Sequence, residues 1–427
     1  MITARAWAGK HYAVYGLARS GLATVQALLA SGAEVTAWDA SADARAKLPD
    51  GAELADLDEA DLGQYQSLVV TPGLPLNRHP IAARAREAGV EIIGDVELFA
   101  RARAELPPHK LVGITGTNGK STTTALVHHI LQTAGVPSTM GGNIGLPILA
   151  QEPLPEGGVY VLELSSYQID LTQSLDCDVA VLLNITPDHL DRYESFDAYA
   201  ASKARLFEMQ RGGVAVLGMG SATAFRPLEK GGHGGVVFTD AVHPEEFGGQ
   251  MAWPVLKGPH NAQNAAAAIA VAFQLDIPDS RIAQSLRTFP GLPHRMERVG
   301  ERSGVTFVND SKATNPTATA PALAAFPAIR WILGGQAKSD NLDECAPHFG
   351  NVRSAYTIGE AAELFERLLA PHMPVKNCGK LAAAVKAAAQ DAQAGDTVLL
   401  SPACASFDQF KDFEDRGDQF REIVGAL

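Results

Sequence analysis

Short apolar runs alternate with segments of helical periodicity along most of the chain. The runs are continuous rather than alternating in polarity, which is typical of strands buried on both faces of a parallel sheet. In the first hundred residues the expected strands are residues 11–15, 34–38 and 67–71, and a helical pattern covers residues 22–30. Such alternation predicts a parallel sheet with crossover helices, and sheets of this kind bind ligands at the carboxyl ends of their strands.

The alternation continues after a proline-containing stretch at residues 101–109, which we interpret as a linker. Further strands are expected at residues 159–164, 179–184, 213–217, 305–309, 330–333, 355–358 and 397–400, and alanine-rich helices at residues 261–273 and 381–390. At 427 residues the chain is too long for one ordinary domain, and its composition changes around residues 290–295. We therefore predict three α/β domains, over residues 1–103, 104–292 and 293–427.

Composition and charge exclude several kinds of protein. With 35 basic and 48 acidic residues the formal net charge is −13, and no basic run could neutralise nucleic-acid phosphates. The four cysteines lie far apart and are interpreted as reduced thiols. The N-terminus lacks the core of a signal peptide, and no apolar stretch is long enough to span a bilayer. We expect a soluble cytoplasmic protein that binds no nucleic acid and does not insert into a membrane.

The segment from Gly113 to Thr122 carries the strongest chemical signal. An apolar run enters a glycine-rich turn that ends in Lys120 and Ser121 and opens a helix, as in a phosphate-binding loop (P-loop). Glycines let backbone N–H groups point at a polyphosphate, Lys120 would reach the outer phosphates, and the Ser121 hydroxyl would hold Mg²⁺. The strict spacing requires glycine where this chain has Ile114, so the loop is a variant. It predicts a nucleoside triphosphate as ligand; the alternative is a glycine-rich turn that binds nothing.

Other polar residues lie in or near the strand ends of the central region. Glu163 ends an apolar strand on the same sheet edge as the P-loop, where a carboxylate suits Mg²⁺. His189, in the turn after the next strand, could be a metal ligand, a substrate contact or a structural residue. Lys203 lies in a helical segment and by itself is interpreted as a solvated lysine. Asn261 and Asn264 begin the alanine-rich helix, where they could face a nucleotide or cap the helix.

The last region concentrates polar residues in three loops that follow strands. The loops span residues 309–316, 334–338 and 401–407. So dense a set at strand ends is typical of a binding site, with plain connectors as the alternative. Arg295 precedes these loops, at the domain junction, where a guanidinium can bind phosphate oxygens in a planar fork. We expect a second substrate to bind in this domain.

The N-terminal turns give a weaker signal. A glycine turn from Gly16 to Gly21 follows the first strand, and Asp39 ends the second, as in a Rossmann-like unit that binds a ribose through an acidic residue. Ala18 replaces the middle glycine of that fingerprint. A third turn, from Thr71 to Gly73, follows the next apolar strand. Alone, these turns are equally consistent with plain connectors.

Together these motifs resemble the Mur ligase family, and the resemblance extends over the whole chain. Beside the P-loop, it rests on Gly141-Gly-Asn143-Ile-Gly145, Glu163-Leu-Ser-Ser-Tyr-Gln168, Gly291-Leu-Pro-His-Arg295, Asn309-Asp-Ser-Lys-Ala-Thr314-Asn315 and Leu400-Ser-Pro-Ala-Cys-Ala-Ser406-Phe-Asp-Gln-Phe410. The match is to the branch of the family that adds D-glutamate. The Asp-Asn-Pro-Arg motif expected of the diaminopimelate-adding branch is not found in the sequence.

The resemblance implies a Rossmann-like N-terminal domain, a central P-loop ATPase-type domain with a mainly parallel sheet, and a Rossmann-like C-terminal domain. It implies an ADP-forming ligase that joins D-glutamate to UDP-N-acetylmuramoyl-L-alanine through an acyl phosphate, in cytoplasmic peptidoglycan precursor synthesis. ATP and two Mg²⁺ ions would take part, and we expect a monomer. The implied catalytic residues are Lys120, Glu163, His189 and Lys203. The implied metal ligands are Ser121, Glu163, His189 and a carbamylated Lys203.

The resemblance also assigns substrate contacts. ATP would contact Gly116, Thr117, Asn118, Gly119, Lys120, Ser121, Thr122, Asn261, Asn264, Arg295 and Asp310. The UDP substrate would contact Gly16, Arg19, Ser20, Asp39, Thr71, Gly73, Asn143, Ser165 and His189. D-Glutamate would contact Lys312, Thr314, Lys338, Ser406 and Phe413. Of these, Lys338 would pair with a glutamate carboxylate.

Three other functions compete with this one. A folylpolyglutamate synthase would keep the P-loop but lack the first domain. A nicotinamide-dependent oxidoreductase would explain residues 11–39 but leave the P-loop, Glu163 and His189 without purpose. A nucleotide-gated binding protein would form no product.

Overall fold

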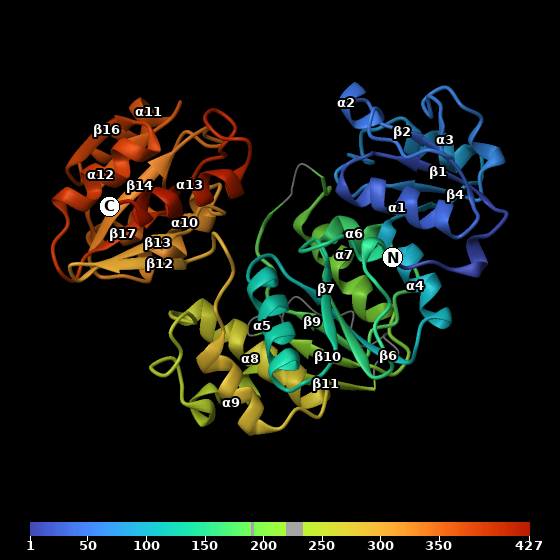
Figure 1. Cartoon of the computed structure of the whole chain (residues 1–427), viewed down its shortest axis with the longest axis horizontal. Helices are drawn as coiled ribbons and strands as arrows, with labels where there is room; N and C mark the ends of the chain where they lie inside the picture. Colours follow the sequence, from blue (N-terminus) through green and yellow to red (C-terminus); the bar gives the residue numbers. More distant parts are fainter. Residues whose placement is uncertain (189–191, 219–233) are drawn as a thin grey trace. The chain divides into compact units, whose positions relative to one another are not determined.

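The computed structural model of the chain describes residues 1–188, 192–218 and 234–427. These residues form two compact units, Met1–Gly249 with Gln263–Arg287 and Gln250–Ala262 with Thr288–Leu427. The first unit contains two parallel sheets, and the second contains one mixed sheet (Figure 1). Helices follow the strands in all three sheets. The α/β fold class predicted from the alternation of apolar runs and helical segments is confirmed.

The N-terminal sheet has five parallel strands in the order β3-β2-β1-β4-β5. The strands are β1 (His11–Tyr15), β2 (Glu34–Trp38), β3 (Glu53–Leu54), β4 (Ser67–Val70) and β5 (Ile92–Ile93). The helices are α1 (Arg19–Ala30), α2 (Ala42–Arg45), α3 (Ile81–Glu87) and α4 (Asp95–Ala102). Successive residues of β1 pack into separate cores, Ala13 into one and Val14 into another. The strand order reverses between β1 and β4, which are followed by the turns at Gly16 and Thr71.

The central sheet has six parallel strands in the order β11-β10-β9-β6-β8-β7. The strands are β6 (His109–Thr115), β7 (Ser138–Gly142), β8 (Gly158–Glu163), β9 (Val179–Leu182), β10 (Val214–Leu217) and β11 (Gly235–Phe238). The helices are α5 (Lys120–Thr133), α6 (Ser166–Asp170), α7 (Phe196–Glu208), α8 (Pro259–Gln274) and α9 (Asp279–Thr288). Because β6 lies between β8 and β9, the P-loop, Glu163 and the turn after β9 emerge at one edge of this sheet.

The C-terminal sheet has the order β12-β13-β17-β14-β15-β16. The strands are β12 (Glu297–Arg302), β13 (Val305–Asn309), β14 (Ile329–Gly334), β15 (Val352–Ile358), β16 (Val375–Gly379) and β17 (Thr397–Leu400). The helices are α10 (Pro316–Ala324), α11 (Ala362–Leu369), α12 (Leu381–Asp391) and α13 (Phe413–Gly425). β12 pairs antiparallel with β13, and the other neighbours are parallel. The sequence pattern did not predict β12, because this strand holds a single large apolar residue, Val299.

Apolar side chains cover both faces of the C-terminal sheet. On one face Trp331 packs with Leu323 of α10 and Phe365 of α11. On the other face residues such as Ile332 pack with α12 and with Phe420 of α13. This two-sided burial explains why most of these strands read as continuous apolar runs.

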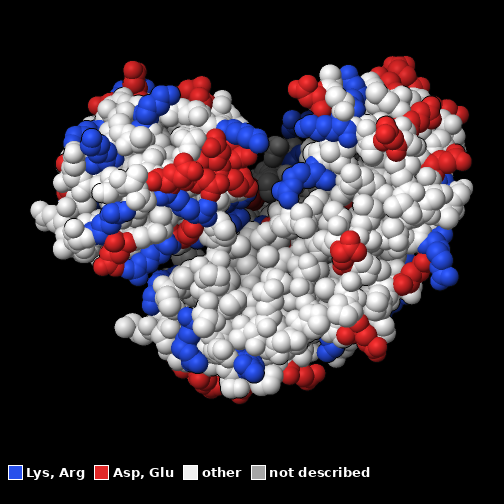
Figure 2. Space-filling view, in the orientation of Figure 1, with Lys and Arg blue, Asp and Glu red and all other residues white. Residues whose placement is uncertain are grey.

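The cysteines are free thiols, and three of the four are buried. Burial raises the pKa of Cys177, Cys345 and Cys404 to about 12 in each case. Cys378, on β16, is only partly buried. On the face drawn in Figure 2, basic and acidic side chains lie interspersed rather than in one basic patch. Among the described residues, no helix combines the length and apolar character needed to cross a bilayer.

Candidate active site

The P-loop links β6 to α5 and depends on left-handed glycines at two positions. Gly116 and Gly119 have φ angles of 152° and 85°, and Gly119 is the N-cap of α5. Asn184, just after β9, fixes the loop by accepting hydrogen bonds from Thr117 N and Asn118 N, both at 2.9 Å. The loop is therefore preformed, and it ends at a helix N-terminus, where backbone N–H groups favour anions.

Helix α8 contacts the P-loop through Asn264. A Cβ atom at Gly119 would lie only 2.2 Å from Asn264 Oδ1, so no larger residue fits there without movement. Asn264 is buried, and the structure thus brings together two residues predicted to bind ATP. Asn261 is also buried, and its Nδ2 donates to Lys257 O at 3.0 Å.

Two lysines converge on one carbonyl oxygen of the P-loop. Lys120 Nζ donates to Gly116 O at 3.0 Å and to Thr117 O at 2.8 Å, and Lys203 Nζ donates to Gly116 O at 3.1 Å. Lys203 is only 1% exposed, so its interpretation as a solvated lysine is wrong. The reason is its position on the face of α7 that packs inward. Burial, and next the charge of Lys120, lowers the pKa of Lys203 to about 7.

Glu163 presents an unsatisfied oxygen at the same sheet edge. It is 2% exposed, and its Oε1 accepts from Asn143 Nδ2 at 2.8 Å. Its buried Oε2 has no hydrogen-bond donor among the described residues. Such an oxygen is unfavourable unless a cation or a ligand group completes it. Carboxylate and hydroxyl oxygens suit Mg²⁺, so Glu163 and the buried Ser121 on the first turn of α5 fit the predicted ion.

His189, predicted as a catalytic residue and metal ligand, lies outside the described residues. Within them, no three His, Cys, Asp or Glu side chains cluster as a metal site by themselves. The predicted ligand set does not require such a cluster, because it includes the Ser121 hydroxyl and a modified Lys203 beside Glu163.

Two polar residues at the P-loop were missed by sequence reasoning. Tyr199 Oη lies 3.2 Å from Thr117 Oγ1, and Lys203 Nζ lies 4.7 Å from the centre of the Tyr199 ring. Tyr199 precedes Lys203 by one helical turn, and this i, i+4 spacing on one helix face could have identified it. Asn184 ends the strand expected at residues 179–184, but its side chain was not recognised as the support of the P-loop.

The turns of the N-terminal sheet bring several predicted UDP-substrate residues together. Gly16 has a φ of 99°, and a Cβ atom there would lie 2.2 Å from Thr71 Oγ1. Ser20, on the first turn of α1, lines a small pocket together with Thr71. Asp39 Oδ2 accepts from Leu17 N at 2.7 Å, which ties the turn after β2 to the turn after β1. The ligand-binding edge expected for this sheet is therefore organised by its own contacts.

Other predicted UDP-substrate residues lie further along the first unit. Arg19 Nη2 donates to Gly145 O at 2.9 Å, and Gly73 O accepts from Arg192 Nη1 at 3.4 Å. Ser165 forms a capping box at the start of α6, so at least one role of its hydroxyl is structural. Contacts of these side chains with a substrate stay a prediction.

The three polar loops of the C-terminal sheet meet at one edge because β13, β17 and β14 are adjacent. Ser401 Oγ donates to Asp310 Oδ2 at 2.8 Å. Gln336 and Ala405 exchange two backbone hydrogen bonds, of 2.9 and 3.0 Å. Loops that are far apart in the sequence are thereby joined into a single polar surface.

The residues predicted to bind D-glutamate belong to these loops and to the start of α13. Lys312 Nζ lies 3.7 Å from the centre of the Phe413 ring, a cation–π contact. Ser406 is buried, Thr314 is half-buried and Lys338 is exposed. The contact between Lys312 and Phe413 therefore joins the first of these loops to the start of α13.

Asp310 and Arg295 were predicted to hold ATP from the C-terminal side. Asp310 is 7% exposed, and burial raises its pKa to about 7. Its Oδ1 accepts from Met296 N at 3.1 Å, so it is bonded to the backbone next to Arg295. The structure thus places these two predicted residues in neighbouring turns.

Comparisons with known proteins give the chain a family. Three family models match it in order: a Mur ligase MurD-like N-terminal domain at residues 10–94, the Mur ligase middle domain at residues 114–272, and the Mur ligase glutamate ligase domain at residues 294–404. A curated relative, the UDP-N-acetylmuramoylalanine–D-glutamate ligase of Novosphingobium aromaticivorans, is 62% identical over 100% of this chain and 97% of its own length. The chain belongs to the Mur ligase family.

Other Mur ligases agree with this assignment. The enzyme of the same name from Sphingopyxis alaskensis is 58% identical, with 100% of both chains covered. Two solved Mur ligases from Thermotoga maritima share the fold. The first is UDP-N-acetylmuramate–alanine ligase, with a TM-score of 0.60 and 16% identity, and the match covers 98% of this chain and 99% of that chain. The second is MurF ligase in complex with ADP, with a TM-score of 0.59 and 15% identity, and the match covers 99% of this chain and 97% of that chain. The family predicted from the sequence motifs is confirmed.

Proposed function

We propose that this Mur ligase joins D-glutamate to UDP-N-acetylmuramoyl-L-alanine and converts ATP to ADP and phosphate, in the synthesis of peptidoglycan precursors. The observation that carries the proposal is the full-length likeness to ligases of that name, among them two at 62% and 58% identity. The domain boundaries 1–103, 104–292 and 293–427 are part of the proposal, as are a monomeric state and a cytoplasmic location.

The chemistry follows from the reactivity of a carboxylate, which is a poor acyl donor until one of its oxygens can leave. A carboxylate oxygen of the L-alanyl group attacks the γ-phosphorus of ATP, and the bond to the β,γ-bridging oxygen breaks to release ADP. The amine of D-glutamate then attacks the carbonyl carbon of the acyl phosphate. Phosphate leaves, and the nitrogen loses a proton to give the amide.

The P-loop supplies most of the charge neutralisation for the first step. Lys120 would exchange its present contact with Gly116 O for the outer phosphates, and the N–H groups that begin α5 would bind phosphate oxygens. Mg²⁺, held by Ser121 Oγ and by the unsatisfied Oε2 of Glu163, would neutralise charge on the transferred phosphoryl group. His189 and a modified Lys203 would hold a second ion.

Lys203 is suited to carbamylation because its amine is neutral in part of the molecules near pH 7. A pKa of about 7 leaves the unprotonated nitrogen free to attack carbon dioxide, with release of one proton. The product is a carboxylate-like oxygen donor on a lysine stem. Its place beside Gly116 would put that donor against the ATP phosphates.

The remaining contacts divide among the three sheets. The UDP substrate would be held by the turns of the N-terminal sheet and by three residues of the central region. These residues are Gly16, Arg19, Ser20, Asp39, Thr71 and Gly73, and then Asn143, Ser165 and His189. The remaining P-loop residues, with Asn261, Asn264, Arg295 and Asp310, would hold the nucleotide, and Lys312, Thr314, Lys338, Ser406 and Phe413 would hold D-glutamate.

The first experiment measures phosphate release from ATP and Mg²⁺ with UDP-N-acetylmuramoyl-L-alanine, in parallel reactions with D-glutamate, L-glutamate, diaminopimelate and glycine. Release that depends on D-glutamate alone supports the proposal. Release with another amino acid would overturn the assignment of the C-terminal loops, and no release with any of them would favour a binding protein.

A substitution in the P-loop separates catalysis from substrate binding. Lys120→Ala should lower turnover by about 10³-fold or more, because phosphoryl transfer depends on positioned positive charge. Binding of the UDP substrate, measured by calorimetry, should stay within about twofold, because its contacts lie elsewhere. Unchanged turnover would contradict the P-loop assignment.

A further inference from the structure

The segment before β12 adopts an unusual backbone conformation. His294 and Met296 have φ angles of 61° and 48°, left-handed values that are uncommon for residues with side chains. Between them lies Arg295, which we assign to the nucleotide phosphates. We name residues 292–297 the His294 turn. Such a conformation persists only where the surrounding structure holds it in place.

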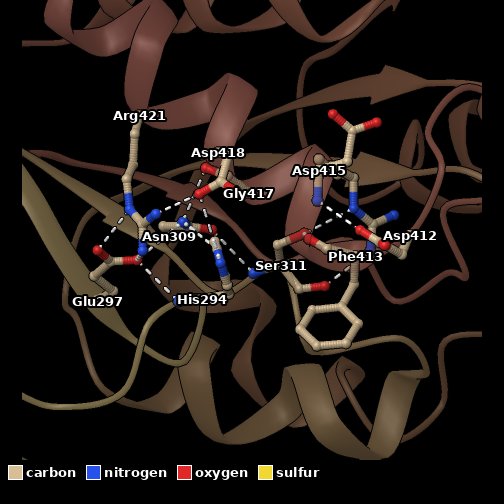
Figure 3. Close-up of polar contacts among 11 residues, drawn as sticks. His294, Glu297, Asn309, Ser311, Asp412, Phe413, Asp415, Gly417, Asp418 and Arg421 are labelled. Atoms are coloured by element: carbon tan, nitrogen blue, oxygen red, sulfur yellow. Dashed lines mark hydrogen bonds and ion pairs between the residues drawn. The ribbon is translucent and has the colours of Figure 1, made fainter. Parts of the chain in front are cut away.

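Glu297, at the end of the His294 turn, provides that hold. Its Oε2 accepts from His294 N at 2.8 Å and from Asn309 Nδ2 at 3.1 Å. Arg421 of α13 binds both carboxylate oxygens, Nε to Oε1 at 2.8 Å and Nη2 to Oε2 at 3.0 Å (Figure 3). A bidentate pair of this kind is fixed in direction as well as distance. Glu297 therefore fastens the turn to β13 and to α13 at once.

Asn309, at the end of β13, completes the arrangement and is fully buried. Its Oδ1 accepts from Ser311 N at 3.2 Å, which directs its Nδ2 toward Glu297, Gly417 O and His294 Nδ1, each at 3.1 Å (Figure 3). An amide nitrogen has two hydrogens, so it satisfies two of these three acceptors at a time. The imidazole also packs directly on α13, because a Cβ atom at Gly417 would lie 2.1 Å from His294 Nδ1.

The His294 turn is bonded to the loop that carries the assigned substrate residues. Lys312 N donates to His294 O at 3.0 Å. Met296 N donates to Asp310 Oδ1 at 3.1 Å. A shift of the turn would therefore move the backbone that presents Arg295, and with it the loop from Asp310 to Lys312.

We propose that Glu297 is a positioning residue of the ligation reaction, which acts through the His294 turn on the placement of Arg295 and Lys312. The inference rests on the proposed function, in which those two residues serve ATP and D-glutamate. The carboxylate of Glu297 is occupied by protein donors, so its influence on the substrates passes through the backbone.

The test compares two glutamates of the same strand. Glu297→Gln keeps the shape of the side chain but turns one oxygen into a donor that opposes Arg421 and the other donors. Glu301→Gln is the matched control, because Glu301 also lies on β12 and pairs with an arginine, Arg298, but at the exposed surface. Glu297→Gln should raise KM for both ATP and D-glutamate about tenfold and lower kcat by a similar factor, with KM for the UDP substrate unchanged. Glu301→Gln should stay within about twofold in every constant.

If Glu297 had a purely structural role, its substitution would change stability rather than the kinetic constants. It would lower the melting temperature and the folded fraction while KM values in the folded fraction stayed at those of the wild type, and that result would overturn the proposal. If Glu297→Gln fails to fold, Arg421→Lys decides, because it keeps the charge but loses the bidentate geometry. KM values for ATP and D-glutamate raised about threefold support the proposal, and unchanged values overturn it. Wild-type protein that releases no phosphate with D-glutamate would instead overturn the proposed function itself.

Discussion

The P-loop region and the loops of the C-terminal sheet are both rich in polar groups, but they satisfy them differently. At the P-loop, the Nζ atoms of two lysines donate to Gly116 O, and Glu163 Oε2 has no donor among the described residues. In the C-terminal sheet, Glu297 and Asn309 are bonded to several protein groups each. The first region keeps unfavourable charges that a phosphate chain and a cation would relieve, whereas the second uses polar groups to fix its own shape. Substitutions at the P-loop should therefore affect turnover with little loss of stability, whereas removal of a buried hydrogen-bonding group in the C-terminal sheet should lower stability as well.

The largest expected effect is on turnover at the P-loop. Glu163→Gln removes the charge that suits Mg²⁺ and should lower kcat by about 10³-fold. The same change removes an incompletely satisfied buried charge, so the melting temperature of the ligand-free protein should stay equal or rise. Steady-state kinetics and thermal unfolding test both parts. Glu208→Gln, at the exposed end of α7, is the control and should change neither. A marked loss of stability in Glu163→Gln would contradict the comparison.

The corresponding change in the C-terminal sheet should act on stability first. Asn309→Ala removes the bonds that the buried Nδ2 donates to Gly417 O and Glu297 and the bond that Oδ1 accepts from Ser311 N, which should lower the free energy of unfolding by about 2–3 kcal/mol. Urea denaturation with a probe in the C-terminal domain measures it. Asn377→Ala, at an exposed position of β16, should change it by less than about 0.5 kcal/mol. Equal values for the two variants would show that the polar groups of this region do not fix its shape.

Substitution of two glycines, one at each end of α5, distinguishes the effect of backbone strain from the effect of disturbing the P-loop contact with Asn264. Gly119 and Gly135 both have positive φ angles, of 85° and 79°, so alanine strains each by about 1 kcal/mol. Only at Gly119 would the added Cβ meet another group, Asn264 Oδ1. Gly119→Ala should therefore raise KM for ATP about tenfold, and Gly135→Ala should leave it unchanged. Equal KM values would rule out a role for this contact in ATP binding.

The smallest expected effect is a pH dependence of stability. Lys203 has a folded-state pKa of about 7, below its ordinary value of 10.5, so between those values the unfolded state binds a proton that the folded state lacks. Stability from this group therefore rises with pH above 7 and is lost as pH falls toward 7. From pH 7.5 to 8.5 the free energy of unfolding of the wild type should rise by about 1 kcal/mol relative to Lys203→Met. Bicarbonate-free buffer keeps the amine unmodified, and Lys386→Met, an exposed control on α12, should show no such difference. If the difference in free energy of unfolding between the wild type and Lys203→Met did not change with pH, the buried amine would have to stay protonated over this range.

Much of the fold could be predicted because a strand that is buried on both faces appears in the sequence as a continuous apolar run. The expected strands at residues 34–38, 305–309 and 397–400 coincide with β2, β13 and β17. The sequence of β12 has no such run, because this mostly polar strand is held by pairing with β13 rather than by burial of apolar side chains. The meeting of three C-terminal loops also depends on which strands are neighbours, and only the structure shows that order.

The candidate site could be predicted where the backbone conformation requires particular residue types. It could not be predicted where tertiary packing determines the burial or conformation of a residue. The P-loop requires glycines and a lysine at set places, and these are legible in the sequence. The burial of Lys203 depends on which face of α7 packs inward, and the left-handed backbone of His294 depends on its surroundings. Neither has a local signature, so Lys203 was interpreted as solvated and the left-handed conformation of His294, in a stretch expected only to turn, was not anticipated.

The contrast among the thiols has a practical consequence for following this molecule in solution. Since Cys177, Cys345 and Cys404 are buried and resist ionisation, a maleimide dye should react first with Cys378. The native sequence thus offers one preferred attachment point, on β16 at the edge of the C-terminal sheet. A fluorophore there could report movement of this sheet as each substrate is added, without any engineered cysteine.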